Sequence, residues 1–174
     1  MKFVENYITR LQSSLDGCGD GISQAIGMVK ELRANGGRLW VLGNGGSMAI
    51  AQHFAQDLLK MRSVRAQALN CPSVLTAYSN DERFEKCFSR PLEILMSPGD
   101  IVLIFSCSGA SRNYDEVVQR RAPVIAVVGT NGGTLKHRAD VCVHVKSSNY
   151  QICETAFSVV ADMINMGLED DSNA

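Results

Sequence analysis

The chain has 174 residues, of which 45% are apolar and 20% are charged, and its formal net charge is −1. This length can bury the core of one compact domain without disulfides or a structural metal. The near-balanced charge leaves no electrostatic footprint for nucleic acid or for an anionic membrane, so we expect neither as a direct partner. No run approaches the roughly 20 apolar residues of a membrane span, and no apolar stretch of signal-peptide length opens the chain. We therefore expect a soluble, cytoplasmic protein.

Two helical patterns come first. Apolar residues recur at helical spacing within 3–15 and again within 22–32, where Asn35-Gly36-Gly37 ends the second pattern. The sheet pattern that follows looks complete without these two helices. We therefore expect residues 1–36 to serve in packing between subunits of a homo-oligomer, and residues 37–168 to form the α/β core.

From residue 38 onward, short apolar runs alternate with helical segments. Continuous runs lie at 38–43, 101–106, 123–129 and 141–145, with 72–78 as a weaker one, and such runs are typical of strands covered on both faces. Helical segments lie at about 48–61, 82–96, 112–121 and 150–168. This alternation predicts one α/β domain, residues 1–174, with a doubly wound sheet of five parallel strands. The six cysteines form no CxxC pair, so we expect them to be reduced.

The run 38–43 leads directly into a glycine-rich loop, Gly43-Asn44-Gly45-Gly46-Ser47. Glycines let the backbone turn sharply and approach a ligand, and the N-terminus of the next helix adds positive partial charge. The loop therefore suits a phosphate or a carboxylate, although it also fits a simple tight turn capped by Ser47. A P-loop is excluded because Gly-Lys-Ser/Thr is missing, and a dinucleotide fingerprint would need glycine where Met48 stands.

A second candidate loop, Ser106-Cys107-Ser108-Gly109-Ala110-Ser111, follows the run 101–106. Its three hydroxyls can donate hydrogen bonds to phosphate oxygens without a buried charge. Ligands of open α/β sheets bind outside the carboxyl ends of the strands. Two such loops at one edge of a sheet therefore predict a phosphate site.

Three motifs together resemble the SIS (sugar isomerase) domain family: G-N-G-G-S at 43–47, S-x-S-G-x-S at 106–111 and G-x-x-G-G at 129–133. The phrase His53-Phe54-Ala55 and the pair Asn80-Asp81 resemble the subgroup of the phosphoheptose isomerases and the DnaA initiator-associating factor. The resemblance covers nearly the whole chain. It implies a three-layer, flavodoxin-like fold, a five-stranded parallel sheet flanked by helices with two N-terminal helices, assembled as a homotetramer.

The resemblance also implies roles for single residues. Cys107 stands where the family usually has threonine, but its backbone N–H can still serve phosphate. The substrate- or phosphate-binding residues that the resemblance implies are Asn44, Gly45, Gly46, Ser47, Asn80, Asp81, Ser106, Cys107, Ser108, Ser111 and Gln151.

The helix 48–61 departs from the family pattern at its acid. The family has a catalytic glutamate four residues after the histidine of its His-Phe-Ala phrase, and this chain has the shorter Asp57 there. His53 and Asp57, at i and i+4, share one face of the helix and suit either metal binding or a hydrogen-bonded pair. The resemblance favours Asp57 as the catalytic base.

The helix 150–168 departs further, because it contains no histidine. The family places Gln or Glu near its start and, eight residues later, a histidine that transfers protons and in several members binds zinc. One register puts Gln151 and Val159 at these positions, and the other puts Glu154 and Asp162 there. We favour the second, because it keeps polar groups two turns apart on one face.

These observations predict a sugar-phosphate aldose–ketose isomerase that resembles phosphoheptose (sedoheptulose 7-phosphate) isomerase and works through an enediol. Asp57 is the expected base, with Asp162 or Glu154 as its partner, while the two loops hold the phosphate. The implied setting is heptose biosynthesis for lipopolysaccharide or capsule precursors. No cofactor is established by the sequence. Zinc is the candidate, with ligands His53, Asp57, Glu154 and Asp162.

The alternative is a non-catalytic SIS protein that binds a phosphosugar or docks a protein partner, as the DnaA initiator-associating factor does. The shortened acid and the missing histidine favour this alternative. The two hypotheses differ in one measurable property, the turnover of a bound phosphosugar.

Overall fold

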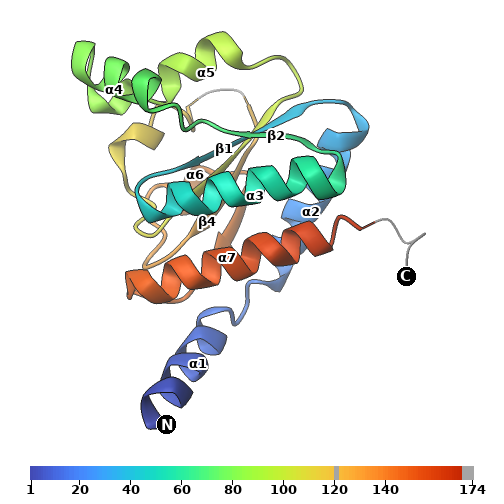
Figure 1. The fold of residues 1–174 in the computed structure, drawn as a ribbon, viewed down its shortest axis with the longest axis vertical. Helices are drawn as coiled ribbons and strands as arrows, with labels where there is room; N and C mark the ends of the chain where they lie inside the picture. Colours follow the sequence, from blue (N-terminus) through green and yellow to red (C-terminus); the bar gives the residue numbers. More distant parts are fainter. Residues whose placement is uncertain (120–121, 170–174) are drawn as a thin grey trace.

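The computed structural model describes residues 1–119 and 122–169 and shows an α/β domain (Figure 1). Its strands are β1 (Arg38–Gly43), β2 (Arg65–Ala68), β3 (Ile101–Ser106), β4 (Val124–Val128) and β5 (Val141–His144). Its α-helices are α1 (Lys2–Ser14), α2 (Gly19–Ala34), α3 (Gly46–Arg62), α4 (Pro72–Asp81), α5 (Ser89–Leu95), α6 (Leu135–Arg138) and α7 (Tyr150–Met166). Two 3-10 turns, η1 (Phe84–Lys86) and η2 (Arg112–Tyr114), complete the set.

The five strands form one parallel sheet in the order β2-β1-β3-β4-β5. This is the doubly wound, flavodoxin-like order, and it confirms the predicted fold class. The strand order reverses between β1 and β3, which pair from Leu39 opposite Ile101 to Gly43 opposite Phe105. The loops after these two strands therefore leave the sheet side by side, at the position where doubly wound folds bind ligands.

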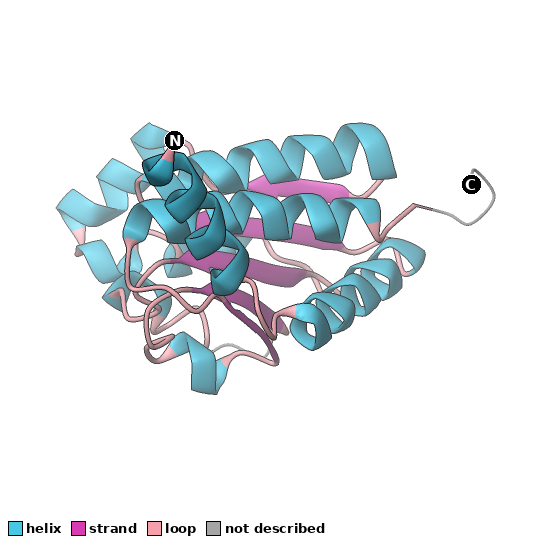
Figure 2. Ribbon diagram, turned by 90° about the horizontal axis from the view of Figure 1, so that it is seen from below, coloured by secondary structure: helices cyan, strands magenta, loops and turns pink. Residues whose placement is uncertain are grey.

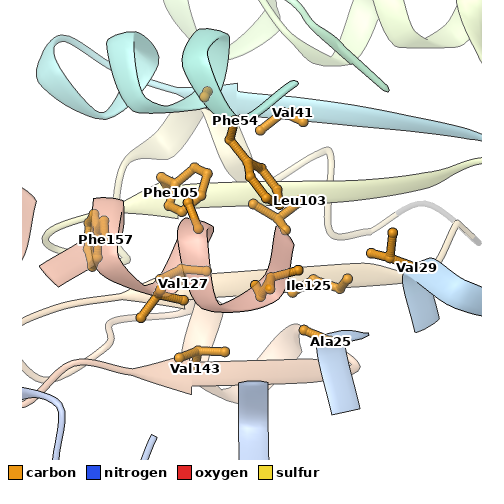
Figure 3. Packing of buried hydrophobic residues seen from close by; sticks show 14 of the residues in the cluster. Ala25, Val29, Val41, Phe54, Leu103, Phe105, Ile125, Val127, Val143 and Phe157 are labelled. Carbon is orange, nitrogen blue, oxygen red and sulfur yellow. The ribbon is translucent and has the colours of Figure 1, made fainter. Parts of the chain in front are cut away.

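Helices cover both faces of the sheet, and Figure 2 shows the strands among them. One face packs against α2, α3 and α7 around Val41, Leu103, Phe105, Ile125 and Val127, as seen in Figure 3. The other face packs against α5, α6 and the segment around η2. Because consecutive strand residues point to opposite faces, the continuous apolar runs of β1, β3 and β4 supply both cores.

The two N-terminal helices play different parts. Ala25, Val29 and Leu32 of α2 are buried in the core on the sheet, so the sheet is not complete without α2. The helix α1 lies outside that layer, toward one end of the molecule (Figure 1), and is held to α7 by a 2.8 Å hydrogen bond between the Tyr7 and Thr155 hydroxyls. Only α1 is therefore an addition to the sheet domain.

The structure corrects the prediction of a strand at 72–78. This segment is the helix α4, which starts with Pro72 in its first turn, where the missing N–H costs nothing. The second strand is instead β2, four residues whose side chains alternate between exposed and buried. β2 is a short edge strand, and its four residues do not form a continuous apolar run in the sequence.

Two predicted helices are shorter than expected. The segment 82–96 is divided into η1 and α5, and Pro91 lies in the first turn of α5, because proline is excluded from a helix interior. The segment 112–121 contains only η2 followed by turns up to residue 119, and residues 120 and 121 lie outside the described residues. All six cysteines are free thiols. Among the described residues, no helix has the length and apolarity to cross a bilayer.

Candidate active site

A pocket of about 310 Å³ lies at the carboxyl ends of β1 and β3. Eight of the residues predicted to bind substrate or phosphate line it together: Asn44, Gly45, Gly46, Ser47, Ser106, Cys107, Ser108 and Ser111. Glu154, at the start of α7, also lines it. The structure therefore joins the two predicted loops into one site, and Glu154 is the single carboxylate among the lining residues that the structure describes.

The first loop, after β1, requires its glycines. A side chain at Gly43 would meet the Ser47 backbone at 2.5 Å, so the strand can turn closely under the first residues of α3 only with glycine there. Gly45, with a φ of +53°, is the N-cap residue of α3 and provides no side-chain cap. The N–H groups at the start of α3 thus lie beside the pocket with the positive end of the helix dipole, which suits an anion.

In the second loop, backbone N–H groups orient two serine hydroxyls. The Gly109 N–H donates to Ser106 Oγ at 3.1 Å, and the Ala110 N–H donates to Ser108 Oγ at 3.2 Å. Each hydroxyl acts as an acceptor in these bonds, so its own hydrogen is left to donate to a ligand. Two oriented donors without a cationic side chain match the way in which a neutral loop would hold phosphate oxygens.

The third motif, G-x-x-G-G at 129–133, supports the second loop from behind. A side chain on Gly109 would collide with the carbonyl oxygen of Gly132, and one on Gly133 would collide with the Gly109 backbone. Both glycines also have positive φ, +64° and +50°. This motif therefore packs its backbone against that of the second loop and shapes the loop, and residues 129–133 do not line the pocket.

The Glu154 carboxylate lies against the first loop, because a side chain at Gly46 would collide with it. Burial raises the pKa of the Cys107 thiol to about 12, and the neighbouring Cys153 and Glu154 add to the rise. Cys107 is therefore a neutral thiol near neutral pH and not a nucleophile. Glu154 is the carboxylate among the described residues that line the pocket.

The other predicted catalytic and substrate residues lie outside the pocket. Asp57 is paired with His53, 3.3 Å apart, and Asp57 is eleven residues beyond Gly46, about 16 Å along α3. Asp162 and Gln151 are exposed on α7. Asn80 and Asp81 hydrogen bond to each other at the exposed end of α4.

The predicted zinc ligands do not fit a metal site within one chain. His53 and Asp57 are paired on α3, Glu154 lines the pocket and Asp162 faces solvent. In the described part of the chain, no three His, Cys, Asp or Glu side chains are arranged to hold a metal ion. The four-ligand set of the sequence interpretation is therefore not assembled here.

Four residues of the site belong to none of the sequence motifs and were not predicted. Phe105, Tyr114 and Tyr150 line the pocket, and Asn113 is fully buried behind it, where it hydrogen bonds to Asn44. The Tyr114 ring stacks on Phe88 with centroids 5.7 Å apart. The only sequence signal for these residues was their closeness to the second loop and to the start of the last helix.

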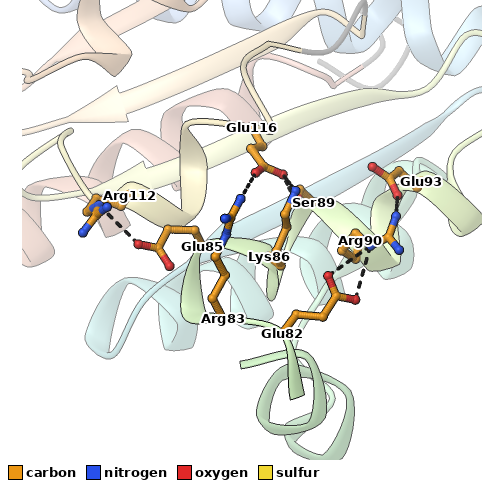
Figure 4. Close-up of polar contacts among 9 residues, drawn as sticks. All are labelled: Glu82, Arg83, Glu85, Lys86, Ser89, Arg90, Glu93, Arg112 and Glu116. Atoms are coloured by element: carbon orange, nitrogen blue, oxygen red, sulfur yellow. Dashed lines mark hydrogen bonds and ion pairs between the residues drawn. The ribbon is translucent and has the colours of Figure 1, made fainter. Parts of the chain in front are cut away.

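A polar network holds the segment behind the second loop, as Figure 4 shows. Glu116 accepts hydrogen bonds from Lys86 at 2.6 Å, from Ser89 at 2.9 Å and from Arg83 at 2.9 Å. These donors, Lys86 first, lower the pKa of Glu116 to about 2. The network ties the turns after η2 to η1 and α5, and so anchors the chain that follows the phosphate loop.

The sequence was also compared with models of known protein families. The model of the SIS domain family matches residues 2–129 of the chain. The chain belongs to the SIS domain family. The matched region contains both pocket loops, 43–47 and 106–111.

Relatives within this SIS family are phosphoheptose isomerases. The chain is 37% identical to the phosphoheptose isomerase of Geobacter metallireducens over 161 residues, covering 84% of this chain and 85% of that one. It is 32% identical to the Helicobacter pylori phosphoheptose isomerase over 149 residues, covering 80% and 78%. The structure of the Neisseria gonorrhoeae phosphoheptose isomerase matches with a TM-score of 0.89 at 28% identity, covering 96% and 95% of the two chains.

Proposed function

We propose that this protein is an aldose–ketose isomerase acting on a phosphorylated sugar, with a heptose phosphate such as sedoheptulose 7-phosphate as its substrate class. The observation that carries the proposal is the convergence of both predicted loops and Glu154 on one pocket. The phosphoheptose isomerase relatives, which share most of their length with this chain, support the same reaction.

Phosphate binding in the pocket would use neutral donors. The hydroxyls of Ser106 and Ser108 and the N-terminus of α3 face the same space, and no Lys or Arg of residues 1–119 and 122–169 is among the lining residues. A phosphate held by these donors fixes the position of the rest of the sugar chain in the pocket. Binding energy at the phosphate then positions the reacting carbons, which lie elsewhere on the substrate.

The reaction itself moves a proton between neighbouring carbons. A carboxylate removes the proton from the carbon beside the carbonyl, and the electron pair forms the carbon–carbon double bond of an enediol. The proton is then returned to the former carbonyl carbon, while the hydroxyl proton passes to the other oxygen. Glu154 is the pocket carboxylate placed to perform the first of these transfers.

We propose that the second proton-transfer group is Asp57 of another copy of the chain. Among the described residues that line the pocket, Glu154 is the only carboxylate, and Asp57 of the same chain is too distant. The His53–Asp57 pair lies on α3, where the His53 side chain is 71% exposed. Exposed apolar residues on α1, α3 and α7 support a homo-oligomer, with a tetramer as the proposed state: Phe3, Val4, Ile8, Leu59, Met61, Met163 and Met166.

The proposed setting is the cytoplasm and a biosynthetic route to heptose-containing lipopolysaccharide or capsule precursors. No step in this proposal uses a metal, because the described residues gather no metal site. The exposed Asn80 and Asp81 at the end of α4 remain proposed substrate contacts, to be supplied through assembly in the same way as Asp57.

The test combines binding and turnover. Melting temperatures are measured with five- to seven-carbon sugar phosphates and with the matching unphosphorylated sugars, and NMR then follows aldose–ketose conversion of each ligand that binds. The proposal predicts stabilisation by the phosphorylated form alone, about 2.7 kcal/mol at 100 times its dissociation constant, and conversion of the bound sugar. Binding without conversion would identify the non-catalytic alternative, and equal shifts with both forms would contradict the phosphate site.

A further inference from the structure

Two asparagine side chains join the two pocket loops. Asn44 Nδ2 donates to Asn113 Oδ1 at 3.1 Å, and Asn113 Nδ2 donates back to Asn44 Oδ1 at 2.9 Å. Asn44 belongs to the first loop, after β1, and Asn113 lies in η2, directly after the second loop. The reciprocal pair is therefore a bridge across the switch point of the sheet.

The surroundings of Asn113 fix the orientation of its side-chain amide. Asn113 is 0% exposed, and its Nδ2 also lies 3.4 Å from Cys87 Sγ, as donor to the sulfur. Both N–H groups and the carbonyl of this amide are thus engaged by protein atoms. A buried amide is tolerated only with such partners, so its orientation is determined by Cys87 on one side and by Asn44 on the other.

Asn44 is only partly engaged by the pair. A primary amide has two N–H donors and two carbonyl lone pairs, and the pair uses one of each. Asn44 lines the pocket, so its remaining N–H and lone pair can bind a ligand there. Held in this way, Asn44 presents one donor and one acceptor side by side, which suits a sugar hydroxyl because a hydroxyl both donates and accepts.

We propose that Asn113 is a positioning residue that fixes the Asn44 amide for recognition of a hydroxyl on the sugar chain. The inference rests on the proposed function for its ligand, a phosphorylated sugar. Asn113 does not line the pocket, so its effect on the ligand passes through Asn44. Without Asn113 the Asn44 amide would rotate freely and lose its fixed donor and acceptor directions.

A double-mutant cycle on ligand affinity tests this route. Asn44→Ala, Asn113→Ala and the double variant are titrated with the phosphosugar that stabilises the wild type. We expect each single variant to weaken binding about tenfold, and the double variant to bind within about twofold of Asn44→Ala. Additive losses would overturn the proposal, because they would mean that Asn113 supports the pocket independently of Asn44. A wild-type level of binding by Asn113→Ala would overturn it too.

A second measurement needs no ligand and no Asn113 variant. Side-chain amide resonances of wild type are compared with those of Asn44→Ala by NMR. The proposal predicts that the Asn44 amide proton bonded to Asn113 exchanges more slowly than the other Asn44 amide proton in wild type, and that the Asn113 amide shifts in the variant. Equally rapid exchange of the two Asn44 amide protons would overturn the positioning role. Because this readout requires no sugar, it separates failure of the positioning role from failure of the proposed function.

Discussion

The carboxylate of Glu154 lies against Gly46, so close that even a methyl group at position 46 would collide with it. Gly46 is the first residue of α3, and Glu154 is the fifth residue of α7. The contact therefore places the pocket's carboxylate directly beside the proposed anion site. The glycine at position 46 is required by this approach and not by its own backbone angles.

Gly46→Ala should displace Glu154 without unfolding the protein. Alanine is a better helix former than glycine, and the colliding atoms are the end of a flexible side chain, so stability should change by less than about 1 kcal/mol. Turnover should fall at least tenfold, because the carboxylate moves relative to the substrate. Kinetics and thermal unfolding of the same preparation provide the check, and unchanged turnover would contradict the role of this contact.

Tyr114→Phe should not reduce stability. The Tyr114 hydroxyl is buried and has no hydrogen-bond partner among the described residues, so its removal relieves an unsatisfied group while the stacking on Phe88 is kept. The free energy of unfolding should stay equal or rise by up to about 1 kcal/mol. Tyr78→Phe, at a half-buried tyrosine of α4, is a control for the loss of a tyrosine hydroxyl. A loss of more than about 1 kcal/mol in Tyr114→Phe would show that the hydroxyl has a partner.

Glu116→Gln should destabilise the protein at neutral pH but not in acid. The folded-state pKa of Glu116, about 2, lies below its ordinary value of 4.5. Its stabilising effect is therefore fully present above about pH 4.5 and is lost as the pH falls toward 2. We expect a cost of about 1 kcal/mol at pH 7.

The control for this variant is Glu85→Gln, since Glu85 pairs with Arg112, whose side chain is 79% exposed, and should contribute little at any pH. Urea unfolding at pH 7 and pH 3 measures both variants. An equal penalty for Glu116→Gln at the two pH values would refute the assigned charge interaction.

Mixed oligomers test whether Asp57 acts across subunits. Asp57→Asn and Glu154→Gln should each lower turnover by about 10²–10⁴-fold while phosphosugar affinity is largely retained. When the two inactive variants are unfolded together and reassembled, some sites combine an intact Asp57 with an intact Glu154, so activity should return. Asp20→Asn is the control, because Asp20 is exposed in the first turn of α2 and does not line the pocket, and it should keep full activity. No recovery in the mixture would reject the shared site.

Much of the fold and the two loops of the pocket could be predicted from the sequence, because both depend on local patterns. The apolar runs of β1, β3, β4 and β5 and the glycine and serine loops each lie within a few consecutive residues. The short edge strand β2 was missed for the opposite reason, since four alternating residues carry little signal.

The acids of α7 show why side-chain placement was harder to predict. Glu154 and Asp162 are eight residues apart, which we took as one face, but eight residues turn an α-helix by about 80° beyond two full turns. Glu154 thus reaches the pocket while Asp162 is exposed. Asn113 was missed because its partner Asn44 is 69 residues away in the chain, and only the pairing of β1 with β3 brings them together.

The most direct test of the isomerase proposal is exchange with solvent of the proton on the carbon beside the carbonyl, which is C1 of a 2-ketose and C2 of an aldose. Wild type and Glu154→Gln are incubated in D₂O with each phosphosugar that stabilises the protein, and NMR follows the signal of that proton. An enediol mechanism predicts its loss in wild type, with a rate at least 100-fold lower in Glu154→Gln. A wild-type protein that binds the sugar and leaves the proton beside the carbonyl unexchanged would contradict the enzyme assignment, and an undiminished rate in Glu154→Gln would contradict the role of Glu154.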